Sequence, residues 1–399
     1  MTTAFHRLFA AVVLLGLTLT ACGEDGGTSG YLVRDSSGIR IVENQASRSD
    51  TTIWQVGEAP LVDIGVLEGD EAYQLFQVGG VVKLSDGRIV VANGGTYELR
   101  FFDADGRYLM SAGREGEGPG EFRGVEQVAQ VGDSIVAYDW GLSRISVFDL
   151  TGQYVRSAHV AWQSEGSAAA LGAFGDGSWL FSTGFSFVPS EISKIVRDTS
   201  DYVVLNADGE LRSPVGRFPR VEFFVLSTAQ QGRATSRDFA RTTVQAVSGD
   251  HAYIGPTDRY EIFRFDTEGR LDLIVRKEHE HLAVTNADID AGKQLRLENA
   301  SGTWRQTLER MYLDMPMPAN MPAFDGLQID ALGNLWVLEY RRPGDDQPSW
   351  TVFAPDGHAL GTVATPPGLT IYQIGNAFIL GTWEDEMEVE HVRMFELTR

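Results

Sequence analysis

From Leu32 to the end of the chain, hydrophobic and polar residues alternate in short runs, and turns containing glycine separate the runs. One strand–turn–strand unit recurs at LRFFDADGRYL (99–109), ISVFDLTGQYV (145–155), YVVLNADGEL (202–211), IFRFDTEGRL (262–271) and WTVFAPDGHAL (350–360). In each turn, an Asp or Asn side chain can accept hydrogen bonds from the local backbone, and the glycine tolerates a positive φ. The pattern therefore predicts an all-β chain built from hairpins.

A second hairpin precedes each of these units, and a sixth outer unit, VRMFEL (392–397), is half present. The preceding hairpins lie at 81–93, 128–139, 171–183, 246–255, 327–340 and 371–383. Paired inner and outer hairpins predict a six-bladed β-propeller with four-stranded blades in one domain, 37–399, because such a repeat buries its faces only against its neighbours. The strand composition of SGIRIVEN (37–44) predicts that this segment completes the last blade and closes the ring.

One stretch departs from the β pattern. Between Thr285 and Met315 the composition and the apolar spacing favour helix, and the proline-rich MPMPANMP (315–322) follows. We therefore expect a helical insertion near 286–313.

The N-terminus has the anatomy of a secretory signal, with an apolar run from Leu8 to Leu19. This run is shorter than the ~20 residues that a membrane-spanning helix needs. The segment LTAC (19–22) resembles the lipobox of bacterial lipoproteins. The resemblance implies a signal peptide at 1–21 and lipidation of Cys22, whereas a plain cleavable signal with an accidental cysteine is the alternative.

Lipidation predicts a protein that is anchored to the membrane of the bacterial cell envelope. Glycines in the segment 22–36 predict a flexible tether between the anchor and the folded domain. Gly23 stands where Asp would signal retention in the inner membrane, so the resemblance favours the outer membrane, on its periplasmic side or at the surface.

Composition narrows the range of partners. The chain has 399 residues with 55 Asp and Glu against 33 Lys and Arg, a formal net charge of -22. A chain this acidic lacks a general basic face, so nucleic acid is not an expected partner. Its single cysteine excludes an intrachain disulfide framework and any zinc site with several cysteines.

The repeats, together with GREGEGPGEF (113–122), make the chain similar to the NHL-like six-bladed β-propellers of bacterial lipoproteins. The resemblance covers residues 37–397 and implies the propeller fold. Because propellers include hydrolases, lyases, lactonases and binding modules, it does not select an activity.

Strand order predicts where a site lies. If each blade runs from a at the axis to d at the rim, the b–c and d–a connections share one face, and the long connections 156–170, 213–245 and 276–325 all belong to it. The candidate ligand-binding residues are those of the b–c connections, namely Asn93, Tyr97, Asp139, Trp140, Asp258, Tyr260, Tyr340, Arg341, Arg342, Trp383, Asp385 and Glu386. Aromatic rings beside charged groups suit a sugar or a peptide, although ring packing and solvated charges explain the same residues.

Without a GxSxG, HExxH or reactive-thiol motif, the sequence favours a binding or scaffolding module for a polar ligand or a protein partner. The alternative is a calcium-dependent enzyme of the lactonase or lyase type. Its calcium would lie in the central channel, with Asp139, Asp258 and Asp385 as candidate ligands. His279 and His281 share one face of a strand, but a zinc site would need a third protein ligand.

Overall fold

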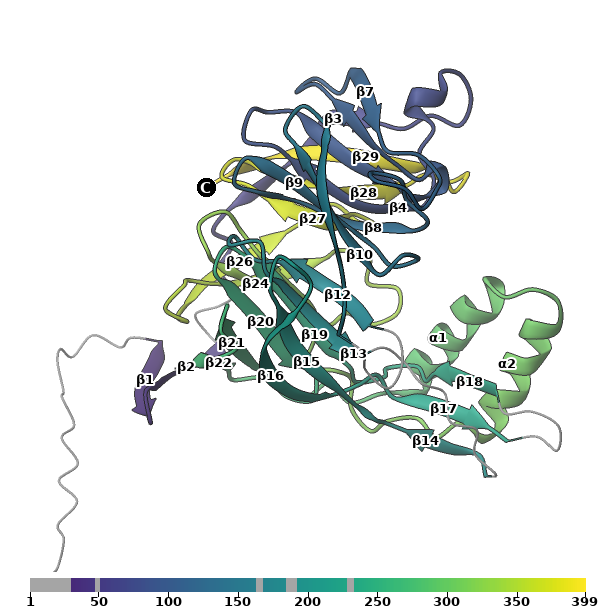
Figure 1. Cartoon of the computed structure of the whole chain (residues 1–399). Helices are drawn as coiled ribbons and strands as arrows, with labels where there is room; N and C mark the ends of the chain where they lie inside the picture. The colour runs from purple at the N-terminus through teal and green to yellow at the C-terminus, as the bar shows by residue number, and fades with distance from the viewer. Residues whose placement is uncertain (1–29, 47–50, 163–167, 184–191, 228–232) are drawn as a thin grey trace, which may run out of the picture.

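The structure is a computed structural model that describes residues 30–46, 51–162, 168–183, 192–227 and 233–399 (Figure 1). The predicted signal peptide and Cys22 lie outside these residues. Within these ranges the chain is mostly β, and neither of the two α-helices is long and apolar enough to cross a membrane.

Six sheets repeat one arrangement, in which four antiparallel strands follow one another from an inner to an outer strand. The first sheet contains β4 (Val78–Lys83), β5 (Ile89–Asn93), β6 (Glu98–Phe102) and β7 (Tyr108–Ala112). The second contains β8 (Val125–Val131), β9 (Ser134–Asp139), β10 (Arg144–Asp149) and β11 (Tyr154–His159). The third contains β12 (Ala168–Ala173), β13 (Trp179–Thr183), β15 (Thr199–Leu205) and β16 (Leu211–Pro219).

The second half of the chain continues the series. The fourth sheet contains β19 (Thr243–Ser248), β20 (His251–Pro256), β21 (Glu261–Asp266) and β22 (Leu271–Lys277). The fifth contains β23 (Phe324–Ile329), β24 (Leu335–Glu339), β25 (Ser349–Phe353) and β26 (Ala359–Ala364). The sixth contains β27 (Thr370–Ile374), β28 (Phe378–Glu384), β29 (Glu390–Thr398) and β3 (Gln55–Ile64). The predicted pairing of inner and outer hairpins is confirmed in all six.

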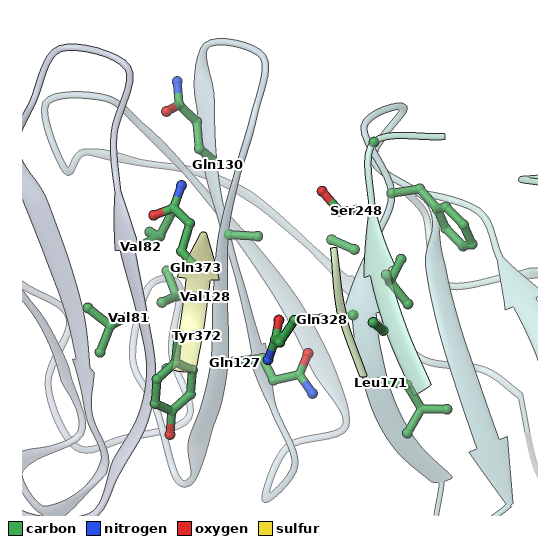
Figure 2. A pocket seen from close by; sticks show the side chains of 18 of the residues that line it. Val81, Val82, Gln127, Val128, Gln130, Leu171, Ser248, Gln328, Tyr372 and Gln373 are labelled. Atoms are coloured by element: carbon green, nitrogen blue, oxygen red, sulfur yellow. The ribbon is translucent and has the colours of Figure 1, made fainter. Parts of the chain in front are cut away.

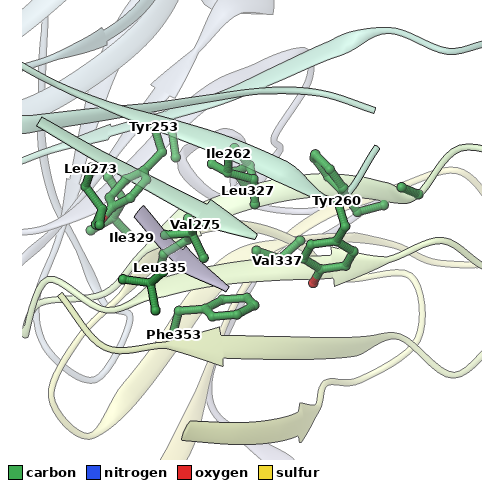
Figure 3. Close-up of a cluster of buried hydrophobic side chains, with 14 residues drawn as sticks. Tyr253, Tyr260, Ile262, Leu273, Val275, Leu327, Ile329, Leu335, Val337 and Phe353 are labelled. Carbon is green, nitrogen blue, oxygen red and sulfur yellow. The ribbon is translucent and has the colours of Figure 1, made fainter. Parts of the chain in front are cut away.

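The middle strands of these sheets are buried on both faces. All five residues of β5 are buried, whereas three of the six residues of the outer strand β11 are exposed. Figure 3 shows the reason at the fourth and fifth sheets, where Ile262, Val275, Leu335 and Phe353 pack in one cluster between the two sheets. A strand that is covered on both faces gives a continuous apolar run in the sequence, which is why these strands were predictable.

The predicted turn chemistry is also confirmed. Asp103 Oδ1 accepts hydrogen bonds from the backbone N–H groups of Asp105 and Arg107, at 2.9 and 2.8 Å, and Gly106 has a φ of 83°. Asn206 makes the equivalent bonds in the third sheet. These contacts lie within each turn and favour the hairpin conformation locally.

The prediction that residues 37–44 complete the last blade was wrong. The segment predicted to complete the last blade forms β2 (Ile39–Asn44), which pairs in parallel with β22 at the outer edge of the fourth sheet. It is β3 that pairs with β29 and completes the sixth sheet. Residues 31–36, predicted as part of the tether, form β1 (Tyr31–Ser36), which pairs with β2.

The strands β1, β2 and β3, here called the N-terminal strap, contact three successive sheets. Between β2 and β3 the chain meets the fifth sheet, where Ile53 N donates to Thr362 O and Thr362 N donates to Thr51 O. The buried Asn44 side chain donates to Arg276 O in the fourth sheet and to Gly357 O in the fifth. The strap therefore joins the outer strands of the fourth, fifth and sixth sheets.

A separate module, here called the helical module, interrupts the series. Its two helices lie where the sequence predicts a helical insertion, near 286–313, whereas its three-stranded sheet was not predicted. The module comprises α1 (Asn286–Glu298), α2 (Gly302–Asp314) and a three-stranded sheet of β14 (Lys194–Val196), β17 (Phe223–Leu226) and β18 (Arg233–Ser236). In Figure 1 the two helices lie beside β17 and β18, away from β1. Thr285 and Asp288 form a capping box at the start of α1, and prolines follow α2. Phe224, Leu308 and Met311 belong to the core of this module.

Candidate functional site

One candidate site is a cavity of about 600 Å³ lined by the inner strands of all six sheets (Figure 2). Residues of β4, β8, β12, β19, β23 and β27 contribute to its wall. We call it the inner cavity. Its volume lies within the range of small-molecule sites in proteins.

Glutamine side chains provide most of the polar groups in the wall. The five glutamines are Gln127, Gln130, Gln245, Gln328 and Gln373. Figure 2 shows four of them extending from strands around the cavity. Each carboxamide offers two N–H donors and an acceptor oxygen, so the wall can hydrogen-bond a ligand that both donates and accepts.

Several of these carboxamides also join neighbouring inner strands. Gln127 Nε2 donates to Ala170 O at 2.6 Å, and Gln328 Nε2 donates to Ile371 O at 2.8 Å. Gln373 Oε1 accepts from Lys83 N at 2.7 Å. These bonds orient the side chains and satisfy backbone groups at the free edges of β12, β27 and β4.

Part of the hydrogen-bonding capacity of the wall is unused. Within the described part of the chain, the side chain of Gln245 has no hydrogen-bond partner, and the Oε1 atoms of Gln127 and Gln328 accept no bond. Tyr372 also lines the cavity, and its hydroxyl donates to Val78 O at 3.2 Å. The free groups are available to a ligand.

The wall of the inner cavity contains no carboxylate, although the chain has 55 acidic residues. Its one charged lining residue is Lys83, whose ammonium lies 4.6 Å from the centre of the Phe378 ring and 3.7 Å from Met394 Sδ. The wall is therefore polar and almost uncharged, which favours a neutral ligand over a metal cation.

The residues predicted at the first two b–c connections make local contacts. Asn93 is buried, and its Oδ1 accepts from Phe76 N while its Nδ2 donates to Thr96 Oγ1. Tyr97 has a φ of 58° and ends the short 3-10 turn before β6. Trp140 is 62% exposed, and its exposed indole is free to contact a ligand.

Buried Asp139 is held in the second connection. Its Oδ2 accepts from Arg123 N at 2.7 Å, and its Oδ1 accepts from Leu142 N at 3.0 Å. Because both oxygens already accept backbone hydrogen bonds, the carboxylate holds the loop in shape.

The residues predicted in the sixth sheet are arranged differently. The Arg393 guanidinium lies 3.6 Å from the centre of the Trp383 ring. Hydrogen bonds from the backbone of Val389 and Met387 lower the pKa of Asp385. Glu386 is exposed in the same turn.

In the fifth sheet the predicted cations contact their own loop or the helical module. Arg341 donates to Asp345 O, whereas Arg342 donates to Asp288 Oδ2 at 2.5 Å, close to the start of α1. Burial, and then the nearby Asp325, raise the pKa of Tyr340 above its usual range.

Asp258 and Tyr260 follow β20 and line surface cavities beside the fourth sheet. Asp258 accepts two hydrogen bonds of 2.6 Å from Arg197. Burial alone would raise the pKa of Asp258, but the Arg197 contact outweighs it and the pKa is lowered. The Tyr260 hydroxyl donates to Glu339 Oε1 at 2.8 Å, and burial raises the pKa of Tyr260.

The structure does not bring the three predicted calcium ligands together. Among the described residues, no group of three or more His, Cys, Asp or Glu side chains is arranged to hold a metal ion. Asp139, Asp258 and Asp385 each make the separate contacts given above. The rings of His279 and His281 lie 5.8 Å apart, edge to face.

The sequence reasoning missed the glutamines of the inner cavity. A signal was present, because Gln127 and Gln328 occupy equivalent repeat positions and each bonds to the carbonyl 43 residues later, on the next inner strand. The rule that long connections carry function points only to residues between strands, and a glutamine within a strand looks like an ordinary solvent-facing residue.

Comparisons with known proteins support the fold. A family model described as "6-bladed beta-propeller" matches residues 67–206. A DUF4221 family member from Bacteroides vulgatus aligns over 88% of this chain and 99% of its own, at 9% identity and a TM-score of 0.51. A putative exported protein from Bacteroides fragilis aligns over 90% of this chain and 99% of its own, at 10% identity and a TM-score of 0.47. No curated protein matches the sequence. The family model supports the six-bladed propeller fold, the match at a TM-score of 0.51 concerns the fold alone, and none of these matches specifically identifies the NHL-like family.

Proposed function

We propose that the six sheets close into one six-bladed propeller whose inner cavity binds a neutral polar ligand, such as a sugar or a short peptide. Contacts between the last and first inner strands support the closure. Tyr372 donates to Val78 O, and Gln373 accepts from Lys83 N.

The observation that carries the binding proposal is the amide-rich, carboxylate-free wall of the inner cavity. Hydroxyl and amide groups of a neutral ligand both donate and accept hydrogen bonds, and carboxamides match them in both roles. The valines, the two leucines and Tyr372 in the same wall supply apolar area for the flat faces of a sugar or a peptide.

The proposal is tested by screening the folded domain with neutral monosaccharides, disaccharides and short peptides, followed by calorimetric titration of a hit. Gln245→Leu keeps the approximate size of the side chain but removes its amide. We expect this variant to bind the hit about fivefold more weakly, because one hydrogen bond contributes about 1 kcal/mol.

Gln153→Leu is the matched control, because Gln153 is exposed in an outer turn. Unchanged affinity in Gln245→Leu together with lost affinity in Trp140→Ala would move the site to the loop-rich face predicted from sequence. A screen without any hit among neutral ligands would contradict the proposal.

The calcium-dependent enzyme stays a prediction from the sequence. No specific contact among the described residues favours it over binding, since the three candidate carboxylates make separate local interactions.

We further propose that the protein is a lipoprotein of the bacterial cell envelope, anchored through Cys22. Cys22→Ser removes the thiol that would carry the lipid. We expect the variant to lose the labelled fatty acid that the wild-type protein incorporates and to accumulate as a larger precursor with its signal peptide uncleaved. Fatty-acid labelling of the variant at the wild-type level would contradict the anchor.

A further inference from the structure

Two adjoining cavities lie beside the connection between β20 and β21, on the loop-rich side of the fourth sheet. Their volumes are about 490 and 390 Å³, and Arg259 and Glu261 line both. We call the pair the arginine groove.

The arginine groove is lined by more cations than carboxylates, in a protein whose net charge is -22. Its cationic lining residues are Arg197, Arg241, Arg259, Arg276 and Lys277. The lining carboxylates are Asp258 and Glu261. The lining is therefore richer in cations than the protein as a whole. Carboxylates outside the lining pair with three of these cations, namely Glu43 with Arg276, Glu222 with Arg241 and Glu339 with Lys277.

Both lining carboxylates are already occupied by cations. Asp258 accepts two bonds from Arg197, and Glu261 accepts from Arg276 Nε at 2.5 Å. Lys277 donates to Glu339, which is not a lining residue of the groove. Arg197, Arg276 and Lys277 therefore have partners and build the wall.

Arg241 and Arg259 are different, because their guanidinium groups make no hydrogen bond within the described part of the chain. The nearest carboxylate oxygen to Arg259 belongs to Glu261, at 3.7 Å, and the Arg259 side chain is 78% exposed. Arg241 lies 3.4 Å from Glu222 and 3.6 Å from Asp258, beyond good hydrogen-bond geometry, and its Nε is buried without a hydrogen-bond partner. Both groups retain donors for a ligand.

We propose that the arginine groove binds the oxyanion group of a ligand, a carboxylate or a phosphate, with Arg241 and Arg259 as its donors. A guanidinium group presents paired N–H donors that fit the oxygens of both anions, and such charge-assisted bonds are stronger than neutral ones. This site is separate from the inner cavity and does not depend on a ligand there.

The test is calorimetric titration of the folded domain with sodium citrate and with sodium phosphate, each against sodium chloride at matched ionic strength. The two arms distinguish a carboxylate from a phosphate ligand. We expect at least one oxyanion to bind more tightly than chloride. Arg259→Gln is expected to weaken that binding by about tenfold, the loss typical of one charge-assisted hydrogen bond.

Arg107→Gln is the matched control, because Arg107 is 73% exposed in the turn between β6 and β7 and does not line the arginine groove. This variant should leave oxyanion binding unchanged. The proposal is overturned if neither anion binds more tightly than chloride, or if Arg259→Gln binds the oxyanion as tightly as the wild-type protein. Since Arg259 is an exposed surface residue, its replacement should not prevent folding.

Discussion

A chain that begins after Ile64, and so lacks the N-terminal strap, is expected to lose its cooperative thermal transition. Without β3, the strand β29 becomes an unpaired edge, and the sixth sheet loses its outer strand. The deletion also removes Ile41, Val42, Val62 and Ile64, which are all buried. Each such side chain contributes about 1.5–3 kcal/mol, so together they contribute about 6–12 kcal/mol, which is comparable to the whole stability of a typical domain.

The control is a shorter deletion that removes only β1, compared with a chain beginning at residue 30. Five of the six residues of β1 are exposed, and the strand lies at the edge of its sheet. We expect the melting temperature of the chain that begins at Ser37 to fall by only about 2–4 °C, as a loss of about 1 kcal/mol would cause. Circular dichroism during heating measures both effects. A sharp, unshifted transition in the chain that begins after Ile64 would show that the strap does not hold the sheets together.

The hairpins were predictable because the interactions that form them are local in sequence. Asp103 and Asn206 accept hydrogen bonds from backbone N–H groups two and four residues later, so a few consecutive residues determine each turn. The position of β2 was not predictable in this way. Its place is fixed by contacts such as Asn44 with Arg276 and Gly357, which are 232 and 313 residues away. Strand composition alone cannot choose between the outer edges of two sheets.

The candidate site was predictable in its general location but not in its chemistry. The rule that long connections carry function led to Asp258 and Tyr260, which line the arginine groove. The same rule also selected Asn93 and Asp139, whose side chains hold their own loops through hydrogen bonds. Residue type does not reveal whether a polar group at a loop is free or already bonded, because that depends on the backbone around it.

The second large expected effect is on protein stability, and it concerns the buried ion pair of Glu222 and Arg237 between the helical module and the fourth sheet. The Glu222 and Arg237 side chains are 6% and 8% exposed. Glu222 Oε2 accepts from Arg237 at 3.0 and 2.6 Å and also from Arg241 N, while Arg237 donates to Pro316 O just after α2. We expect Glu222→Gln to lower the free energy of unfolding by about 3–5 kcal/mol, because it leaves the Arg237 charge buried without its counter-ion.

A double-mutant cycle, with the free energy of unfolding of each variant measured in urea, separates the effect of the uncompensated Arg237 charge from a simple loss of contacts. Replacing both residues, as Glu222→Gln with Arg237→Met, removes the uncompensated charge, so the double variant should be more stable than Glu222→Gln alone. Asp105→Asn is the control at an exposed pair, Arg107 with Asp105, and should cost less than about 1 kcal/mol. If the double variant is as unstable as the sum of the two single variants, the ion pair does not couple the two residues. The helical module would then be held to the sheets by its other contacts. One of these is the bond from Arg342 to Asp288, which joins the loop after β24 to α1.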